Sequence, residues 1–251
     1  MSLFLTSSLP LAASPSGGDN ERQDSLAVKS DEIFSPTQLI VPVSLIAIGS
    51  WGVSNGYLKQ INNSVKSGMS HLRGQHYFHA DDYIQYLPAA AYIALDFTGI
   101  KAKHPLRERI AAGATAYIAM AAAVNSTKYL VKEMRPDGSA RNSFPSGHSA
   151  TAFTGAELVR IEYGTIPGIA SYTIATGVAF LRLYNERHWL NDVIAGAGVG
   201  ILSAKIGYWM LPLYRKWFHW DNGKSSSPML VISPSYDNTS HGVSLALSCQ
   251  F

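Results

Sequence analysis

The chain has 251 residues, of which 47% are hydrophobic and 15% are charged, and its formal net charge is +3 at pH 7. The charged fraction is well below the roughly 25% of a typical soluble domain, which favours a membrane protein or a heavily buried helical protein. The small net charge, without a basic patch interleaved with aromatic residues, argues against nucleic-acid binding. The single cysteine, Cys249, excludes an internal disulfide and a zinc site built from cysteines.

Residues 1–38 are predicted to form a polar N-terminal tail. Within it, "LFLTSSLPLAAS" resembles the apolar part and the small-residue end of a secretory signal, although no Lys or Arg precedes it. We interpret residues 1–38 as a polar tail or as the remnant of a trimmed signal. A cleaved signal would place the residues after it outside the cytoplasm, so the side of the membrane on which the tail lies stays open.

Six apolar runs follow the tail, and they predict the fold class. The runs cover residues 39–53, 83–100, 110–124, 150–161, 166–183 and 193–213. Several are shorter than the roughly 20 residues that cross a bilayer, so a buried helical core is the alternative. The last two are long, nearly uncharged and rich in Gly, Ala and Ser, which is typical of closely packed membrane helices. We therefore predict an all-α protein, a polytopic membrane bundle of about six helices over residues 39–213.

Residues 214–251 are predicted to form a C-terminal tail. An aromatic and basic belt, typical of a membrane interface, joins the tail to the last apolar run. The belt consists of Tyr208, Trp209, Tyr214, Arg215, Lys216, Trp217 and Trp220. Beyond the belt, "MLVIS" and "GVSLALSCQF" flank the polar "SYDNTSHG", and the second of them alternates apolar and polar residues. This pattern favours a short β-hairpin.

Basic residues predict the orientation of the helices in the membrane. The link over residues 101–109 holds four basic residues and one acidic residue, and Arg215 and Lys216 follow the last run. Cytoplasmic loops carry an excess of Lys and Arg, so we place both segments in the cytoplasm. The links after residues 124 and 183 then share the outer side. We accordingly predict a multi-pass protein of the inner membrane with its site facing the periplasm.

The first outer link reads "KYLVKEMRPDGSARNSFPSGH" and combines two cations with a helix start. Lys128 and Arg135 are seven residues apart, which predicts that both lie on one helix face just before Pro136 ends the helix. The Ser, Pro and Gly of "SFPSGHSA" stand directly before an apolar run and predict a new helix. Its unpaired N–H groups and positive dipole end can hold an anion beside His148.

The second outer link reads "LRLYNERHWLND" and contains a second histidine. His188 and Asp192 are four residues apart, a spacing that lets the carboxylate orient the imidazole and stabilise its charged form. Arg182 precedes this histidine by six residues. The two links together place three cations, two histidines and one carboxylate on one side of the membrane.

These residues form the pattern Lys-x6-Arg-Pro, then Pro-Ser-Gly-His, then Arg-x5-His-x3-Asp. The pattern resembles that of the type 2 phosphatidic acid phosphatase superfamily, whose relatives include the vanadium haloperoxidases. The matching residues are Lys128, Arg135, Pro136, Pro145, Ser146, Gly147, His148, Arg182, His188 and Asp192. The resemblance covers about residues 39–213. Leu181 is a departure, because the third block of the family usually has Ser before its Arg.

The resemblance implies a mechanism that needs no metal and no other cofactor. His188, ordered by Asp192, would attack phosphorus and form a phosphohistidine, while His148 would protonate the leaving alkoxide and later activate water. The predicted catalytic residues are thus His188, His148 and Asp192. Cations and main-chain N–H groups would hold the phosphate oxygens. The predicted phosphate-binding residues are Lys128, Arg135, Ser146, Gly147 and Arg182.

A weaker signal lies in "HLRGQHYFHADD", residues 71–82. His76, His79, Asp81 and Asp82 have spacings that a metal ion can use. A polar stretch with His, Tyr and Phe that enters an apolar run is more typical of an interfacial helix, which we favour. On the predicted topology this segment lies on the outer side, where it can contact a substrate headgroup.

The predicted partner is the lipid bilayer, and the predicted substrate is a membrane lipid with a phosphate headgroup. The resemblance implies three bacterial candidates: lipid A, undecaprenyl diphosphate, and glycerolipids such as phosphatidate or phosphatidylglycerophosphate. We favour lipid A because the polar segment 57–82 is suited to a saccharide headgroup. The alternatives are a vanadium haloperoxidase and a non-enzymatic lipid-binding role. The sequence makes no prediction of the oligomeric state.

Overall fold

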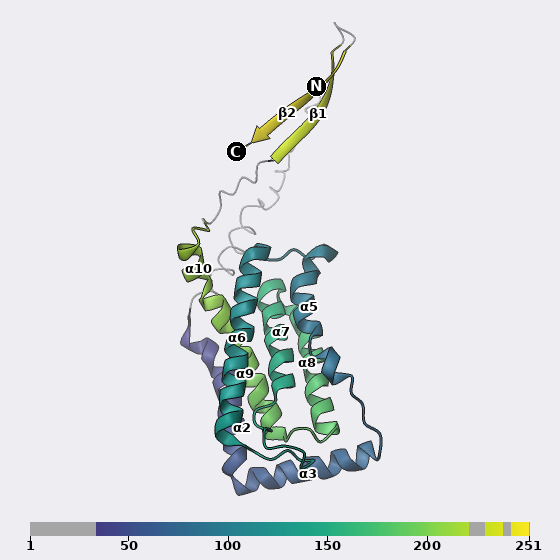
Figure 1. Ribbon diagram of the computed structural model, residues 1–251, viewed down its shortest axis with the longest axis vertical. Coiled ribbons are helices and arrows are strands. Elements are labelled where there is room, and N and C mark those ends of the chain that lie inside the picture. The colour runs from purple at the N-terminus through teal and green to yellow at the C-terminus, as the bar shows by residue number, and fades with distance from the viewer. Residues whose placement is uncertain (1–33, 221–228, 238–241, 251) are drawn as a thin grey trace, which may run out of the picture. The chain divides into compact units, whose positions relative to one another are not determined.

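The computed structural model describes residues 34–220, 229–237 and 242–250. Its residues group into two compact units, Met1–Leu211 and Pro212–Phe251. The described part of the first unit is helical, which confirms the predicted all-α fold (Figure 1). Its elements are η1 (Pro36–Leu39), α2 (Ile40–Ser54), α3 (Gly56–Arg73), α4 (Asp81–Ile84), α5 (Leu87–Ala94), η2 (Leu95–Thr98), α6 (Leu106–Val131), α7 (Gly147–Tyr163), α8 (Thr165–Tyr184) and α9 (Leu190–Trp209). The predicted tail or signal remnant falls mainly on residues 1–33, which lie outside the described residues.

Four of the described helices are long and apolar enough to cross a membrane. They are Pro36–Ser54, Leu106–Val131, Thr165–Tyr184 and Leu190–Trp217. The two other predicted runs correspond to α7 and to α5 with η2. Helix α7 has only 17 residues and carries Glu157 and Glu162 in buried positions. Each carboxylate has partners within the bundle, since Glu157 pairs with Lys205 at 2.8 Å and Glu162 accepts from Tyr208 Oη at 2.6 Å. Helix α7 is therefore an internal helix of mixed polarity.

The centre of the bundle is the contact between α7 and α9. Glycines of α9 make this contact close, because a Cβ at Gly200 would lie 2.5 Å from the carbonyl oxygen of Ala150. A Cβ at Gly196 would lie 2.5 Å from the carbonyl oxygen of Ser146. Small residues allow such approaches between helix backbones. The first turns of α7 and α9 therefore lie side by side, and both carry predicted site residues.

The close approach at Gly200 leads to a stability prediction. Gly200→Ala is expected to lower the free energy of unfolding by about 1–3 kcal/mol, because backbone atoms of Ala150 and Thr154 must move to admit the methyl group. The matched control is Gly177→Ala on α8, where no described atom of another element lies within 4 Å of the added Cβ. Thermal unfolding of the two variants in detergent measures the difference. Equal stability of both variants would contradict the close packing of α7 and α9.

Helix α3 runs crosswise to the long helices at one end of the bundle (Figure 1). The side chain of Asn55 caps its start, accepting from the N–H groups of Tyr57 and Leu58. Two hydrogen bonds join α3 to the bundle end: Asn62 Nδ2 donates to Asn191 Oδ1 at 2.6 Å, and Lys66 Nζ donates to the Pro136 carbonyl at 2.7 Å. Of residues 71–82, where an interfacial helix was expected, residues 74–80 are not helical and lie between α3 and α4. Polar side chains of α3 cover the end where the α6–α7 and α8–α9 loops meet.

The second unit contains the strands expected for the C-terminal tail. Strand β1 (Met229–Asp237) pairs antiparallel with β2 (Gly242–Gln250), and Met229 lies opposite Gln250. Helix α10 (Leu211–Trp217) begins at the last residue of the first unit. The boundary between the units, after Leu211, lies close to the predicted end of the membrane bundle at residue 213.

Candidate active site

Two loops at the end of the bundle covered by α3 bring the predicted site residues together. The α6–α7 loop and the first turn of α7 carry Arg135, Ser146, Gly147 and His148. The last turns of α6 and α8 carry Lys128 and Arg182, and the start of α9 with its preceding loop carries His188 and Asp192. The two loops are bonded to each other, because the Ser146 N–H donates to the Asp192 carbonyl at 3.0 Å. Residues from four helix ends therefore share one site.

His188 and Asp192 lie close together, as their spacing predicted, although they do not lie on one helix. Helix α9 begins at Leu190, so His188 lies in the loop before it and Asp192 in its first turn. Asp192 Oδ2 accepts from the Trp189 N–H at 2.9 Å and lies 3.4 Å from His188 Nδ1. The carboxylate thus caps the start of α9 and also contacts the His188 imidazole. With Nδ1 beside Asp192, Nε2 is the ring nitrogen that the carboxylate does not hold.

Ser143 is a site residue that the sequence analysis did not identify. Its Oγ donates to Asp192 Oδ2 at 2.5 Å and lies 3.5 Å from His188 Nδ1. Asp192 Oδ2 therefore has three donors around it, which fixes the carboxylate beneath the imidazole. Ser143 is the first residue of the stretch "SFPSGHSA", but a serine in a loop has too many ordinary roles for its position to predict this contact.

The electrostatic setting of His188 shows that the cations converge on it. Burial holds the pKa of the His188 imidazole well below its usual range, and the positive charges of Arg182, Lys128 and Arg135 and the His148 ring act in the same direction. The side chain is only 3% exposed. Its ring is therefore neutral near pH 7, the form in which an imidazole nitrogen has a lone pair for attack.

The three predicted phosphate-binding cations lie around the site in different ways. Lys128 Nζ donates to the carbonyls of Asn142 and Ser143, so it also holds the loop that leads into α7. Arg135 and Arg182 each have a buried Nε with no hydrogen-bond partner among the described residues. A buried guanidinium N–H without a partner is costly, and two of them at one site are suited to the oxygens of a phosphate.

The position of Arg135 corrects the prediction that Lys128 and Arg135 share a helix face. Helix α6 ends at Val131, where Lys132 takes a left-handed conformation with φ 50°. Arg135 therefore lies in the loop, and its N–H donates to the Ala140 carbonyl at 3.0 Å. The helix stops because of this capping turn, several residues before Pro136. The loop, and not a helix face, sets the position of the guanidinium.

Ser146 and Gly147 begin α7 as predicted, but the Ser146 N–H is not free to bind phosphate. It donates to the Asp192 carbonyl, and Ser146 Oγ accepts from Ser149 Oγ at 3.0 Å and from the Ser149 N–H at 3.4 Å. The close packing of α7 and α9 accounts for this, because it brings the Asp192 carbonyl to the helix start. Ser146 is thus the N-cap of α7, and Gly147 stays the predicted main-chain donor.

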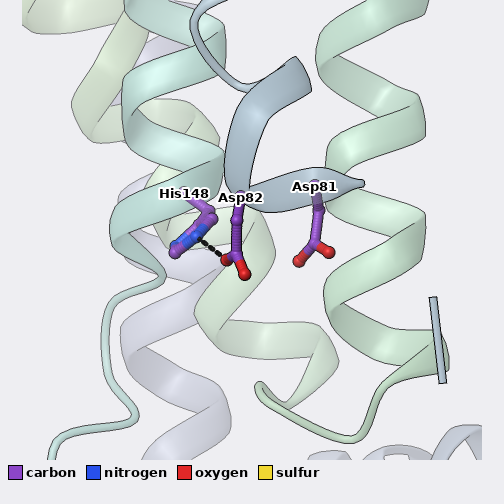
Figure 2. Close-up of side chains that lie close together, drawn as sticks. All are labelled: Asp81, Asp82 and His148. Carbon is purple, nitrogen blue, oxygen red and sulfur yellow. Dashed lines mark hydrogen bonds and ion pairs between the residues drawn. The ribbon is translucent and has the colours of Figure 1, made fainter. Parts of the chain in front are cut away.

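His148 is paired with a carboxylate from another part of the chain. Figure 2 shows that Asp82, from α4, points toward the ring, and its Oδ1 lies 2.8 Å from His148 Nε2. Beside it, Asp81 is fully buried and forms an ion pair with Arg182 Nη1. Arg182 Nη1 also lies 3.5 Å from Asp82 Oδ1. One cluster therefore contains both acids, the second histidine and a predicted phosphate-binding arginine.

This cluster bears on the metal site considered from the sequence. The ligand atoms of Asp81, Asp82 and His148 all lie within 4.8 Å of one another, a grouping that a metal ion can use. The structure thus places Asp81 and Asp82 with His148, in a group that does not include the expected His76 and His79. The Arg182 guanidinium already supplies a positive charge to both carboxylates. The two acids are therefore better suited to binding this arginine than to binding a metal ion.

Comparison with known proteins found a family model and a curated relative that match part of this chain. Residues 110–216 match the model of the PAP2 superfamily. A curated relative, the lipid A 1-phosphatase of Porphyromonas gingivalis, is 39% identical over 137 residues, which cover 53% of this chain and 31% of that protein. The chain therefore spans less than a third of the length of this relative.

Two solved structures are also similar to the chain. The crystal structure of Aquifex aeolicus LpxE is 20% identical, with a TM-score of 0.44, and the match covers 56% of this chain and 92% of that one. The first transmembrane PAP2-type phosphatidylglycerolphosphate phosphatase from Bacillus subtilis is 18% identical, with a TM-score of 0.27, and covers 82% and 89%. The three sequence blocks and the helix ends that hold them all lie within the matched segment. The PAP2 superfamily model thus matches the part of this chain that holds the three blocks, residues 110–216.

Proposed function

We propose that the chain is an integral-membrane, metal-independent phosphatase that hydrolyses a lipid phosphate, with lipid A as the favoured substrate. The observation that carries the proposal is the buried, Asp192-paired His188 among three cations, two of which have a buried Nε without a partner in the part of the chain that the structure describes. A neutral nucleophile surrounded by fixed positive charge is suited to a phosphoryl group, whose charge the cations neutralise. The three side chains supply the positive charge that a metal ion would otherwise provide.

The first step of the proposed reaction transfers the phosphoryl group to the protein. His188 Nε2 attacks phosphorus, the Nε2–P bond forms, and the ester P–O bond breaks on the opposite side. His148 gives a proton to the leaving oxygen, so the lipid departs as an alcohol, or as a phosphate when a diphosphate is cleaved. Arg135, Arg182 and Lys128 hold the non-bridging oxygens, with the Gly147 N–H at the start of α7.

The second step returns the protein to its starting state. His148, now neutral, takes a proton from water as the water oxygen attacks phosphorus. The Nε2–P bond breaks, inorganic phosphate leaves, and both histidines regain their original protonation. Asp192 keeps the His188 ring in one orientation and stabilises its positive charge in the phosphohistidine.

A membrane setting supports a lipid as substrate. Large apolar side chains of the candidate spans are exposed, among them Ile118 and Leu130 on α6 and Ile166 on α8, at 70%, 83% and 84%. Such surfaces are suited to lipid chains. The basic link 101–109 precedes α6 at the end opposite to Lys128, which supports a cytoplasmic link and a site that faces the periplasm at the inner membrane.

The preference for lipid A rests on the space beside the site. A hollow of about 260 Å³ is lined by Lys59, Asn62, Asn63, Glu133, Met134 and Trp189. Asn62 and Trp189 also line a small cavity that includes His188, so this hollow lies next to the proposed nucleophile. Amide side chains and an indole ring are suited to a saccharide headgroup. The name of the Porphyromonas gingivalis relative agrees with this choice.

The proposal is tested by measuring phosphate release from purified protein in EDTA. Lipid A is expected to react much faster than undecaprenyl diphosphate, phosphatidate, phosphatidylglycerophosphate or nitrophenyl phosphate, because contacts remote from phosphorus position the phosphate. In cells, mass spectrometry should find lipid A that has lost one phosphate with the wild-type protein and not with His188→Ala. Faster reaction of another lipid would transfer the assignment to that lipid. Loss of activity in EDTA, or halide oxidation that requires vanadate, would overturn the proposed reaction.

A further inference from the structure

We propose that Asp82 is the positioning residue of His148, which it orients and keeps protonated for the transfer of a proton to the leaving group. The inference rests on the proposed function and adds to it a residue outside the three sequence blocks. The observation behind it is the 2.8 Å contact between Asp82 Oδ1 and His148 Nε2 (Figure 2). An imidazole that donates Nε2–H to a carboxylate has Nδ1 left for the substrate.

Asp82 lies on a segment that is firmly attached to the site. Two hydrogen bonds join the stretch before α4 to Asn185, which follows α8: the Phe78 N–H donates to Asn185 Oδ1 at 3.1 Å, and Asn185 Nδ2 donates to the Phe78 carbonyl at 2.8 Å. The buried ion pair of Asp81 with Arg182 holds the first turn of α4 against α8. These contacts fix the position of Asp82 and thereby hold its carboxylate against His148.

The pairing of Asp82 with His148 is similar to that of Asp192 with His188. In each pair a carboxylate oxygen holds one ring nitrogen and leaves the other for the reaction. The pairs differ in burial: Asp192 and His188 are buried, whereas the side chains of Asp82 and His148 are 50% and 26% exposed. A nucleophile is suited to a site shielded from water, while a group that must exchange protons with water is suited to partial exposure.

The charges around His148 show why it needs a carboxylate. Burial and the Arg182 guanidinium of α8 lower the pKa of His148, while Asp82 and Asp81 of α4 act in the opposite direction. The neighbouring ring of His188, from the α8–α9 loop, is electrostatically coupled to His148. Without Asp82, a smaller fraction of His148 would carry the proton that the leaving group requires.

The test compares Asp82→Asn, Asp82→Glu and a matched control, Asp137→Asn. Asp137, on the α6–α7 loop, pairs with Arg187 of the α8–α9 loop at 3.2 Å. The control therefore removes one carboxylate at the same end of the bundle. For a lipid substrate with a poor leaving group, kcat of Asp82→Asn is expected to fall roughly 10- to 100-fold, less than a general acid contributes in full. KM is expected to stay within about 3-fold, because Asp82 acts through His148 and not on the lipid.

The pH profile has a predicted sign. The value of kcat/KM falls as the pH rises through the pKa of the acid, since only the protonated acid works. Asp82→Asn removes a charge that raises the pKa of His148, so the basic limb is expected to move to lower pH by about one unit. In Asp82→Glu the basic limb should return most of the way to its wild-type pH, and in Asp137→Asn it should not move. In a His148→Ala background, Asp82→Asn should have no further effect on kcat.

A second readout does not depend on catalysis. Histidine-selective NMR in detergent should show the His148 ring, identified by its loss in His148→Ala, titrating at lower pH in Asp82→Asn. An active Asp82→Asn protein with an unchanged titration and pH profile would overturn this inference alone. A lower KM with a higher rate would also overturn it, because Asp82 would then be an anion that competes for the phosphate site. A wild-type protein that releases no phosphate from any lipid would overturn the proposed function itself.

Discussion

Replacing His188 with Ala is expected to abolish phosphate release, by a factor of roughly 10⁴ or more, because the variant lacks the proposed nucleophile. The residue is buried beside Asp192, and its Nε2 is the ring nitrogen that is not held by the carboxylate. Binding of the lipid should persist, since Lys128, Arg135 and Arg182 are still present. The measurement is single-turnover phosphate release together with lipid binding in the same detergent.

A matched control separates this effect from unfolding. His219→Ala removes an exposed histidine outside the site and should retain full activity. Both variants should unfold at the same temperature within the error of the method. Only then does the loss of activity in His188→Ala report on the chemical step. Activity of a well-folded His188→Ala protein within a few-fold of the wild type would exclude a phosphohistidine at this position.

Replacing His148 with Ala is expected to slow the reaction by roughly 10²–10⁴-fold for a lipid with a poor leaving group. The loss should be much smaller for nitrophenyl phosphate, whose leaving group departs without a proton. The physical reason is that His148, held by Asp82 at 2.8 Å, supplies the proton to the leaving oxygen. The measurement is the ratio of kcat/KM for the two substrates in the wild type and in the variant.

The same variant predicts an intermediate that can be trapped. His148 also activates water in the second step, so His148→Ala should form the phosphohistidine from nitrophenyl phosphate faster than it hydrolyses it. Rapid quenching at high pH, where phosphohistidine survives, followed by mass spectrometry should locate the phosphoryl group on His188. An equal loss for both substrates, without a trapped intermediate, would contradict the proposed role of His148.

Much of the site was predictable because its residues lie in short sequence motifs. Lys128, Arg135, His148, Arg182, His188 and Asp192 follow a family pattern, and that resemblance implied phosphate chemistry. The structure brings all six to one end of the bundle. The small residues of the last apolar run likewise indicated close helix packing, which Gly196 and Gly200 provide. These features depend on residue type and spacing, and both can be read from the chain.

Helix boundaries were less predictable, and the reason is the competition between caps. Pro136 was expected to end the helix that carries Lys128, but the left-handed Lys132 ends it first. His188 and Asp192 were predicted to pair, but their spacing did not show that α9 begins between them, at Leu190. The Asp192 carboxylate lies in the first turn of α9, where it accepts from the Trp189 N–H and also reaches His188 in the preceding loop.

By itself, the sequence determined that the chain is helical and apolar enough for a membrane, and it predicted the residues of the proposed phosphate site. Only the tertiary structure decided how these residues are supported. Asp82 meets His148 across 66 positions of the chain, and Ser143 meets Asp192 across 49. The Ser146 N–H is likewise used by the Asp192 carbonyl, although its place at a helix start suggested phosphate binding. Local spacing reports neighbours within about one helical turn, whereas these contacts arise where packed helix ends bring distant loops together.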